Sequence, residues 1–374
     1  MDNKLIMFLN ALLILILLSS CSNNSKPNQN SEKVIFETSL NIHIDKNLSV
    51  NAEIKTPQKD SYSTFNANVR ILSPDEVIES CFADNCDVEL QKTGDDEYFI
   101  SADEETAYFS CYLKQFSTKF YKKQLTLINV LNTDFQPKHI TYAYPIKFGN
   151  YVMRDELISL KKGTAIKRAK KFLDSLKVNV KEEPDYIYAF DKKVLKEMQE
   201  KVIQKVDLDY LKASGSDAIL DEITKNDEFY YMLWSVKVED EGFLDGNYNR
   251  GEVDGLNEIT IGTTILVAMN SEKILATNIS RLYEVTSKAS DYNVLLPMDN
   301  ILATIRNKYR NTILTSELVF SEVKFCYAPR VIDFEELKYE IVPAWSFFAE
   351  YDNARGDAEA IIVTINAITG EVIN

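Results

Sequence analysis

The chain has 374 residues, of which 57 are acidic and 42 are basic, so its formal net charge at pH 7 is −15. A negative balance of this size argues against nucleic-acid binding and against docking on anionic lipid headgroups through a basic face. Hydrophobic residues make up 45% of the chain and aromatic residues 11%, which excludes a disordered stalk and is enough to build folded cores.

Residues 1–20 have the pattern of a bacterial lipoprotein signal peptide. Leu5 to Leu18 form an apolar run that is shorter than the roughly 20 residues needed to span a bilayer. Small residues then precede Cys21, as in the bacterial lipobox, where the first mature residue carries a diacylglyceryl group on its thiol. We therefore predict a lipid anchor on Cys21 and a position on the extracytoplasmic face of the cell membrane, or at the outer membrane of a two-membrane envelope. The alternative is an uncleaved membrane anchor with an incidental cysteine.

Residues 21–32 are predicted to be a flexible tether between the lipid and the folded part. After the cysteine, this segment is polar and lacks any large apolar side chain. The two or more acyl chains of a lipoprotein give stable membrane attachment, whereas a single chain gives only reversible binding.

Four further cysteines could form disulfides, and they are Cys81, Cys86, Cys111 and Cys326. An even number in an extracytoplasmic chain permits three connectivities, which the sequence does not distinguish. The alternative is that they are buried thiols of helix and strand cores. With two histidines and no paired CxxC motif, the chain is predicted to hold no metal and no cofactor.

Residues 33–150 are predicted to form one α+β domain rich in antiparallel strands. Residues 34–56 alternate apolar and polar side chains around a turn that ends at Asn47, which is typical of a β-hairpin. Ser73 and Glu76 have the spacing of a capping box at the start of a helix. Further strands are expected near residues 97–101, 107–113 and 140–146.

The rest of the chain repeats one pattern, a helix followed by antiparallel strands, and we predict two such units at 155–290 and 291–374. Thr164 is the expected N-cap of the first helix, and a helical insertion at 191–225 lengthens the first unit. The expected strands are 230–238 and 259–275 in the first unit, and 339–351 and 360–373 in the second.

The two tryptophans of the chain support a duplication. Trp234 and Trp345 are each followed by serine and lie in a strand after the helix. Each unit then reaches an asparagine, Asn270 or Asn366, followed by a short turn. The alternative is two unrelated stretches that are alike by chance.

The C-terminal residues 365–373 (INAITGEVI), together with VPAW at 342–345, resemble PepSY-type modules and the related YycI and YycH regulators. Such modules end in a strand, an Asn/Asp-Ala pair, a Thr-Gly turn and a last strand, and Gly370 suits the positive φ of such a turn. The resemblance is specific for the unit 291–374, looser for 155–290 and general for 33–150. The whole chain also resembles an uncharacterised lipoprotein family of Gram-positive, clostridia-like bacteria.

The resemblance implies a non-enzymatic protein that binds or regulates another envelope protein or a peptidase. It transfers no catalytic residue, and Trp234, Trp345, Asn366 and Gly370 are then fold determinants. The first alternative is a lipoprotein that binds a small ligand or a glycan, and the second is an envelope hydrolase such as a two-carboxylate glycosidase. The chain contains no P-loop, G-x-G-x-x-G or G-x-S-x-G motif.

Two acidic loops, 240–257 and 352–358, are candidate cation sites, and the sequence does not decide whether they bind one. The first loosely resembles a calcium loop, but Gly251 stands one place late and Leu256 occupies the position of the EF-hand glutamate. Solvated hairpin loops are the default interpretation.

Overall fold

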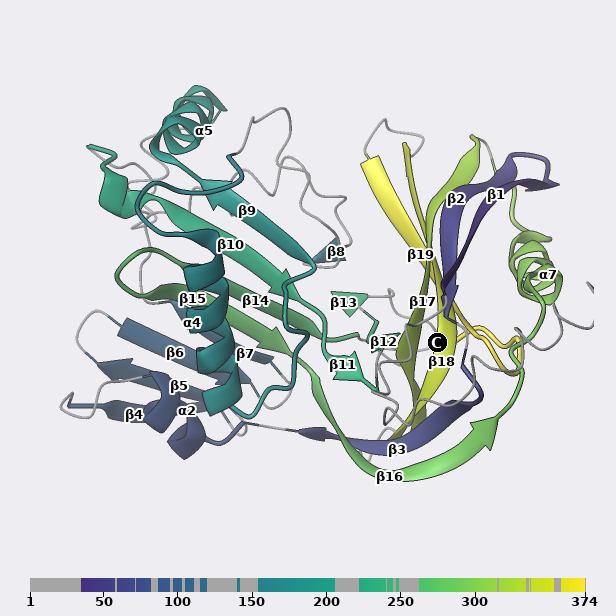
Figure 1. Cartoon of the computed structure of the whole chain (residues 1–374), viewed down its shortest axis with the longest axis horizontal. Helices are drawn as coiled ribbons and strands as arrows, with labels where there is room; N and C mark the ends of the chain where they lie inside the picture. The colour runs from purple at the N-terminus through teal and green to yellow at the C-terminus, as the bar shows by residue number, and fades with distance from the viewer. Residues whose placement is uncertain are drawn as a thin grey trace, which may run out of the picture. The chain divides into compact units, whose positions relative to one another are not determined.

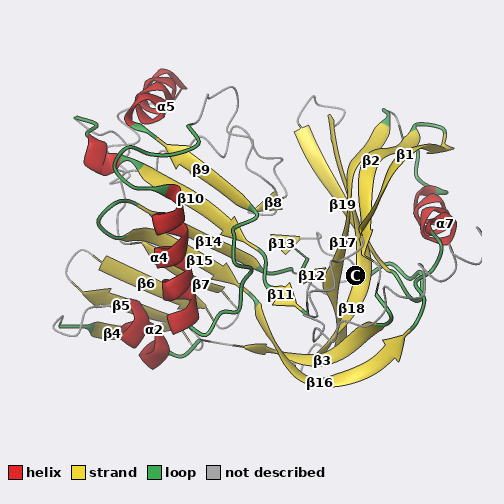
Figure 2. Ribbon diagram, in the orientation of Figure 1, coloured by secondary structure: helices red, strands yellow, loops and turns green. Residues whose placement is uncertain are grey.

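Antiparallel strands dominate the computed structural model of the chain, and helices lie against their faces (Figures 1 and 2). The described residues are 35–57, 59–70, 72–81, 87–94, 97–102, 105–110, 115–119, 140–141, 154–205, 222–239, 241–244, 247–248, 262–314, 316–333, 336, 338–352 and 358–373. Within them, the strands form one seven-stranded sheet, one eight-stranded sheet and two short two-stranded sheets. The predicted α+β class is confirmed.

The seven-stranded sheet has the order β1-β2-β17-β18-β3-β16, and β19 pairs with part of β18. Its strands are β1 (Ile35–Asp45), β2 (Leu48–Pro57), β3 (Tyr62–Arg70), β16 (Leu282–Tyr292), β17 (Leu318–Asp333), β18 (Lys338–Asp352) and β19 (Ala358–Asn366). Helix α7 (Met298–Tyr309) buries Ile301, Leu302 and Ile305 in the same core as Trp345 and Phe347 of β18. This apolar stripe explains why the helix lies on the sheet.

The eight-stranded sheet has the order β4-β5-β6-β7-β15-β14-β10-β9. Its strands are β4 (Glu89–Gly94), β5 (Glu97–Ala102), β6 (Glu105–Ser110), β7 (Gln115–Lys119), β9 (Tyr186–Phe190), β10 (Phe229–Trp234), β14 (Thr264–Met269) and β15 (Ile274–Ser280). The helices α2 (Pro74–Cys81) and α4 (Lys162–Ser175) cover one face of this sheet (Figure 2) and share its core. The remaining elements are α5 (Lys192–Lys205), the short helix η1 (Lys225–Asp227), and the two-stranded sheets of β11 (Lys237–Val238) with β12 (Glu241–Gly242) and β8 (Ile140–Thr141) with β13 (Asn247–Tyr248).

The strands of the predicted domain 33–150 are divided between the two large sheets. β1 to β3 belong to the seven-stranded sheet, and β4 to β7 belong to the eight-stranded sheet. The division depends on pairings between distant segments, such as parallel β2 with β17 and antiparallel β7 with β15. Strand alternation in a sequence identifies a strand but does not identify its partner. The grouping of strands therefore differs from the predicted boundaries at 150 and 290, since β16 leaves the first unit to join the other sheet.

The two predicted helix starts have different outcomes. The capping box of α2 is confirmed, because the Glu76 backbone N–H donates to Ser73 Oγ over 3.2 Å and the Ser73 backbone N–H donates to a Glu76 carboxylate oxygen over 3.0 Å. The prediction for Thr164 is wrong. Helix α4 begins at Lys162 after Lys161, without a side-chain cap.

Several predicted features fall on residues that the structure does not describe. The signal peptide, Cys21, the tether, Cys86, Cys111 and most of both acidic loops lie outside the described residues. Cys81 is the last residue of α2, and Cys326 is buried in β17.

None of the helices in the described part of the chain is long and apolar enough to cross a membrane.

Candidate functional site

Two parts of the chain repeat the same order of elements. In the first, α4 is followed by the antiparallel neighbours β9, β10, β14 and β15. In the second, α7 is followed by the antiparallel neighbours β17, β18 and β19, and Val372 then makes an antiparallel bridge to Ile365 of β19. The helix-plus-meander order is therefore common to both.

An asparagine closes the third strand of each repeat with the same hydrogen bonds. Asn270 Oδ1 accepts from the backbone N–H groups of Glu272 at 2.9 Å and Lys273 at 2.8 Å. Asn366 Oδ1 accepts from those of Ile368 at 2.8 Å and Thr369 at 3.1 Å. Both asparagines are buried, and their side-chain oxygens satisfy N–H groups of partly buried turns.

Each helix also holds the turn after its asparagine. When the buried Ile166 of α4 is aligned with the buried Leu302 of α7, Arg168 corresponds to Thr304. The Arg168 guanidinium donates to the carbonyl oxygens of Ser271 and Glu272 at 2.8 and 2.7 Å. Thr304 Oγ1 donates to the carbonyl oxygen of Gly370 at 2.9 Å, and Gly370 has a φ of 76°.

The tryptophans lie in corresponding strands but at different registers. Trp345 pairs with the residue directly before Asn366, whereas the residue directly before Asn270 pairs with Tyr230, four residues before Trp234. Tyr230 therefore occupies the position of Trp345. Its hydroxyl accepts from the Leu157 backbone N–H at 2.8 Å and donates to the Leu160 carbonyl at 3.1 Å.

A short hairpin formed by β11 and β12 separates two cavities. Residues 236–239 line the first cavity, of about 460 Å³, and residues 241–244 line the second, of about 300 Å³. Phe243 makes a parallel bridge with Tyr327 of β17, and the Leu244 backbone N–H donates to the Tyr327 carbonyl at 2.7 Å. These contacts hold the hairpin on the seven-stranded sheet.

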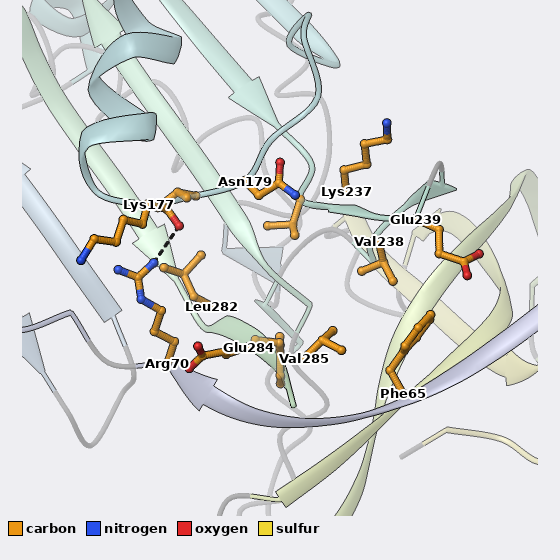
Figure 3. Close-up of a pocket in the computed structure, with 13 residues that line it drawn as sticks. Phe65, Arg70, Lys177, Asn179, Lys237, Val238, Glu239, Leu282, Glu284 and Val285 are labelled. Carbon is orange, nitrogen blue, oxygen red and sulfur yellow. Dashed lines mark hydrogen bonds between the residues drawn. The ribbon is translucent and has the colours of Figure 1, made fainter. Parts of the chain in front are cut away.

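The first cavity lies at the C-terminal end of α4 (Figure 3). Lys177 takes the left-handed conformation with a φ of 54°, and the Val178 backbone N–H returns to the Leu173 carbonyl at 2.9 Å, which is a Schellman ending. Arg70 donates to the carbonyl oxygens of Lys177 at 2.8 Å and Leu176 at 3.0 Å, so a cation stabilises the negative end of the helix. The polar groups that Arg70 offers to this cavity are thus already engaged.

The hairpin turn is fixed by a strained glutamate. Glu239 has a φ of 53°, a conformation that glycine adopts more easily. Its carboxylate accepts from Lys59 Nζ at 3.1 Å and from the Tyr327 hydroxyl at 3.2 Å. Burial, and then the nearby Glu239 carboxylate, raise the pKa of Tyr327, so this hydroxyl stays protonated and keeps donating.

The second cavity is lined by paired charges. Lys181 Nζ lies 2.6 Å from Asp185 Oδ1, and Lys324 Nζ lies 3.1 Å from the Tyr186 hydroxyl. Phe243 and Leu244, which follow β12, also line it. The cavity thus offers both donors and acceptors.

Strand β16 is exposed along most of its length. Nine consecutive residues, 284–292, are exposed, and among the described strands only β3 pairs with β16. Its start is anchored, because the buried Arg281 donates to the hydroxyls of Tyr283 and Tyr339. Val285 and Tyr292 are 45% and 37% exposed, so the strand presents apolar as well as polar side chains.

No metal site emerges from the described residues. None of their histidine, cysteine and acidic side chains gather in a group of three or more that could hold a metal ion. His43 is exposed on β1.

Comparisons with known proteins address the fold alone. No family model matches the chain, and no curated protein matches it. The fold is similar to the crystal structure of an uncharacterized protein from Eubacterium rectale ATCC 33656, with a TM-score of 0.56 and 13% sequence identity, over 91% of this chain and 93% of that chain. At this identity, the likeness carries no information on function.

Sequence reasoning did not identify the hairpin, the two cavities or β16. Residues 282–292 are mostly polar and lack a strong apolar alternation, because neither face of this strand is buried. The only signal was the β-branched pair Val285 and Thr286 after Tyr283.

Proposed function

We propose that this protein is a lipid-anchored, non-enzymatic protein of the extracytoplasmic face that binds an extended segment of another envelope protein along the outer edge of β16. The observation that carries the proposal is the run of nine exposed residues at the edge of the seven-stranded sheet. A strand at a sheet edge has unpaired backbone N–H and C=O groups, to which an extended peptide adds as a further strand.

The composition of β16 suits reversible binding of a partner. Register shifts between Val285 and Ser287 and between Lys288 and Ser290 interrupt its pairing with β3. Bulges and charged side chains at sheet edges limit uncontrolled edge-to-edge aggregation. Each added backbone hydrogen bond contributes roughly 1 kcal/mol net, so several of them together with Val285 and Tyr292 give useful affinity without a deep pocket.

The repeated units support the same class of function. Their common strand order, the equivalent turns at Asn270 and Asn366, and the INAITGEVI ending favour tandem PepSY-like modules. Modules of that family act through protein contacts, so this part of the proposal agrees with the one based on β16.

The proposed anchor at Cys21 would place β16 on the same side of the membrane as its partner. A lipid does not cross both leaflets, so any signal to the cytoplasm would have to pass through that partner.

Site-specific photocrosslinking in cells tests the proposal. A benzoylphenylalanine in place of Thr286 on β16 should crosslink to one predominant envelope protein, whereas the same residue in place of Ile313, which is 89% exposed and not part of β16, should not. Equal crosslinking from both positions, or none from Thr286, would argue against the edge as a binding surface.

A further inference from the structure

We propose that the second cavity binds a single neutral sugar ring, such as a hexose or an N-acetylhexosamine. The cavity is lined by residues of β9, β17, β18 and the β11–β12 hairpin. This inference goes beyond the proposed protein-binding function and does not depend on it.

A buried hydroxyl in the cavity wall lacks a partner. Ser346 is 4% exposed, lines the cavity, and its Oγ has no hydrogen-bond partner in the structure. Buried hydroxyls in proteins are nearly always hydrogen-bonded, so an unsatisfied one next to an open cavity indicates a missing polar partner there.

The cavity exists because small side chains line the sheet beneath it. Ser346 of β18 and Cys326 of β17 line it with short side chains, and Ala344 pairs with Cys326. Gly242 closes another side with bare backbone, since a Cβ atom there would lie 3.1 Å from Lys181 Nζ.

The charges of the cavity cancel, which favours a neutral ligand. Its lining contains two lysines, Lys181 and Lys324, and two acids, Asp185 and Glu241. Lys181 is paired with Asp185 at 2.6 Å, and Lys324 with Glu322 at 2.5 Å. An ion would have to disrupt these pairs, whereas sugar hydroxyls can donate to the carboxylates and accept from the ammonium groups without a change in charge.

The size of the cavity limits the ligand to one ring. Its volume of about 300 Å³ lies at the lower end of the range for small-molecule sites, roughly 300–1,000 Å³. A longer glycan would extend out of the cavity.

Calorimetric titration of the purified full-length protein in detergent tests the inference. Glucose and N-acetylglucosamine are the neutral probes, and inorganic phosphate and glutamate are the charged ones. We expect saturable binding of at least one neutral sugar and none of the charged probes. Ser346→Ala should weaken that binding about fivefold to tenfold, because it removes one hydrogen bond.

Thr277→Val is the matched control. Thr277 is also a buried hydroxyl without a partner, at 1% exposure, but it does not line either cavity. It should leave sugar affinity unchanged. The inference is overturned if no neutral sugar binds at millimolar concentration, if only the charged probes bind, or if both variants change the affinity equally. The inference is also overturned if crystals soaked with the sugar show only a water molecule hydrogen-bonded to Ser346 Oγ.

Discussion

Asn270 and Asn366 belong to different sheets, yet each side-chain oxygen accepts hydrogen bonds from the backbone N–H groups two and three residues further along the chain. Asn270 directly follows the third strand of its helix-plus-meander unit, and Asn366 is the last residue of the corresponding strand. Each turn is held by the helix of its own unit through Arg168 or Thr304. This correspondence extends over a turn, a strand and a helix face. It supports the proposal that the two units share a common architecture.

Replacing either asparagine by alanine should destabilise the fold by about 2 kcal/mol, because two turn N–H groups lose their acceptor in a partly buried turn. Urea denaturation measures the change. Asn366→Asp keeps an acceptor oxygen and should cost less than Asn366→Ala. Asn270→Asp should cost more than Asn366→Asp, since the Asn270 amide N–H₂ also donates to the Asn226 carbonyl at 3.1 Å. Equal losses for all four variants would contradict the assigned hydrogen bonds.

Gly370→Ala should cost about 1–2 kcal/mol, because its φ of 76° is unfavourable for a residue with a Cβ atom. The added atom would also lie 3.0 Å from Leu296 Cδ1. Gly163→Ala is the control, since nothing lies within 4 Å of a Cβ there and the residue is in helix α4. That variant should be stabilised by about 0.5 kcal/mol. The melting temperatures of the two variants should therefore move in opposite directions, and a shared direction would refute the prediction.

Glu76 should make stability depend on pH in the acid range. The Ser73 backbone N–H, and also the Arg70 guanidinium, hold the pKa of Glu76 below its ordinary value against the opposing effect of burial. Because the folded-state pKa is lowered, the stabilisation is fully present above the ordinary glutamate pKa of about 4.3 and is lost as the pH falls through the folded-state pKa. Thermal unfolding between pH 7 and pH 3 should show a smaller loss of stability in Glu76→Gln than in the unmodified protein. Parallel curves for the two proteins would argue against this assignment.

Cys21→Ala should abolish the incorporation of a labelled fatty acid and release the protein from the membrane fraction. Replacement of the next residue, Ser22→Ala, is the control and should leave both properties unchanged. Firm attachment of the Cys21→Ala protein without the label would indicate an uncleaved membrane segment instead.

Local patterns predicted local structure well. The capping box at Ser73, the hairpin turn at Asn47 and the stripe of Ile301, Leu302 and Ile305 are each encoded within a few residues, and each is found in the structure. The start of α4 was missed because Thr164 has the residue type of a cap but lies within the first turn of the helix. The alignment of Trp234 with Trp345 is wrong in register, because Tyr230 is the residue of the first unit that corresponds to Trp345.

The arrangement of strands could not be read from the sequence, because it depends on non-local pairing. β2 joins β17 across more than half of the chain, and β3 pairs with β16 within the seven-stranded sheet although more than 200 residues separate them. The cavities share this dependence. Ser346 and Tyr186 are ordinary residues in the sequence, and only the pairing of their strands and the hairpin between them brings them to one cavity.

The most direct measurement of the central claim is amide hydrogen exchange in β16, with and without the partner segment. That segment is the one that crosslinks to the benzoylphenylalanine in place of Thr286. In a regularly paired antiparallel edge strand, alternate N–H groups point outward, so the outward amides between the two register shifts and on either side of them, within Glu284 to Tyr292, should slow by about tenfold or more when an extended segment binds. Slowing confined to β16 is the result that we predict. Tight binding of the segment with unchanged exchange throughout β16 would contradict the proposed function.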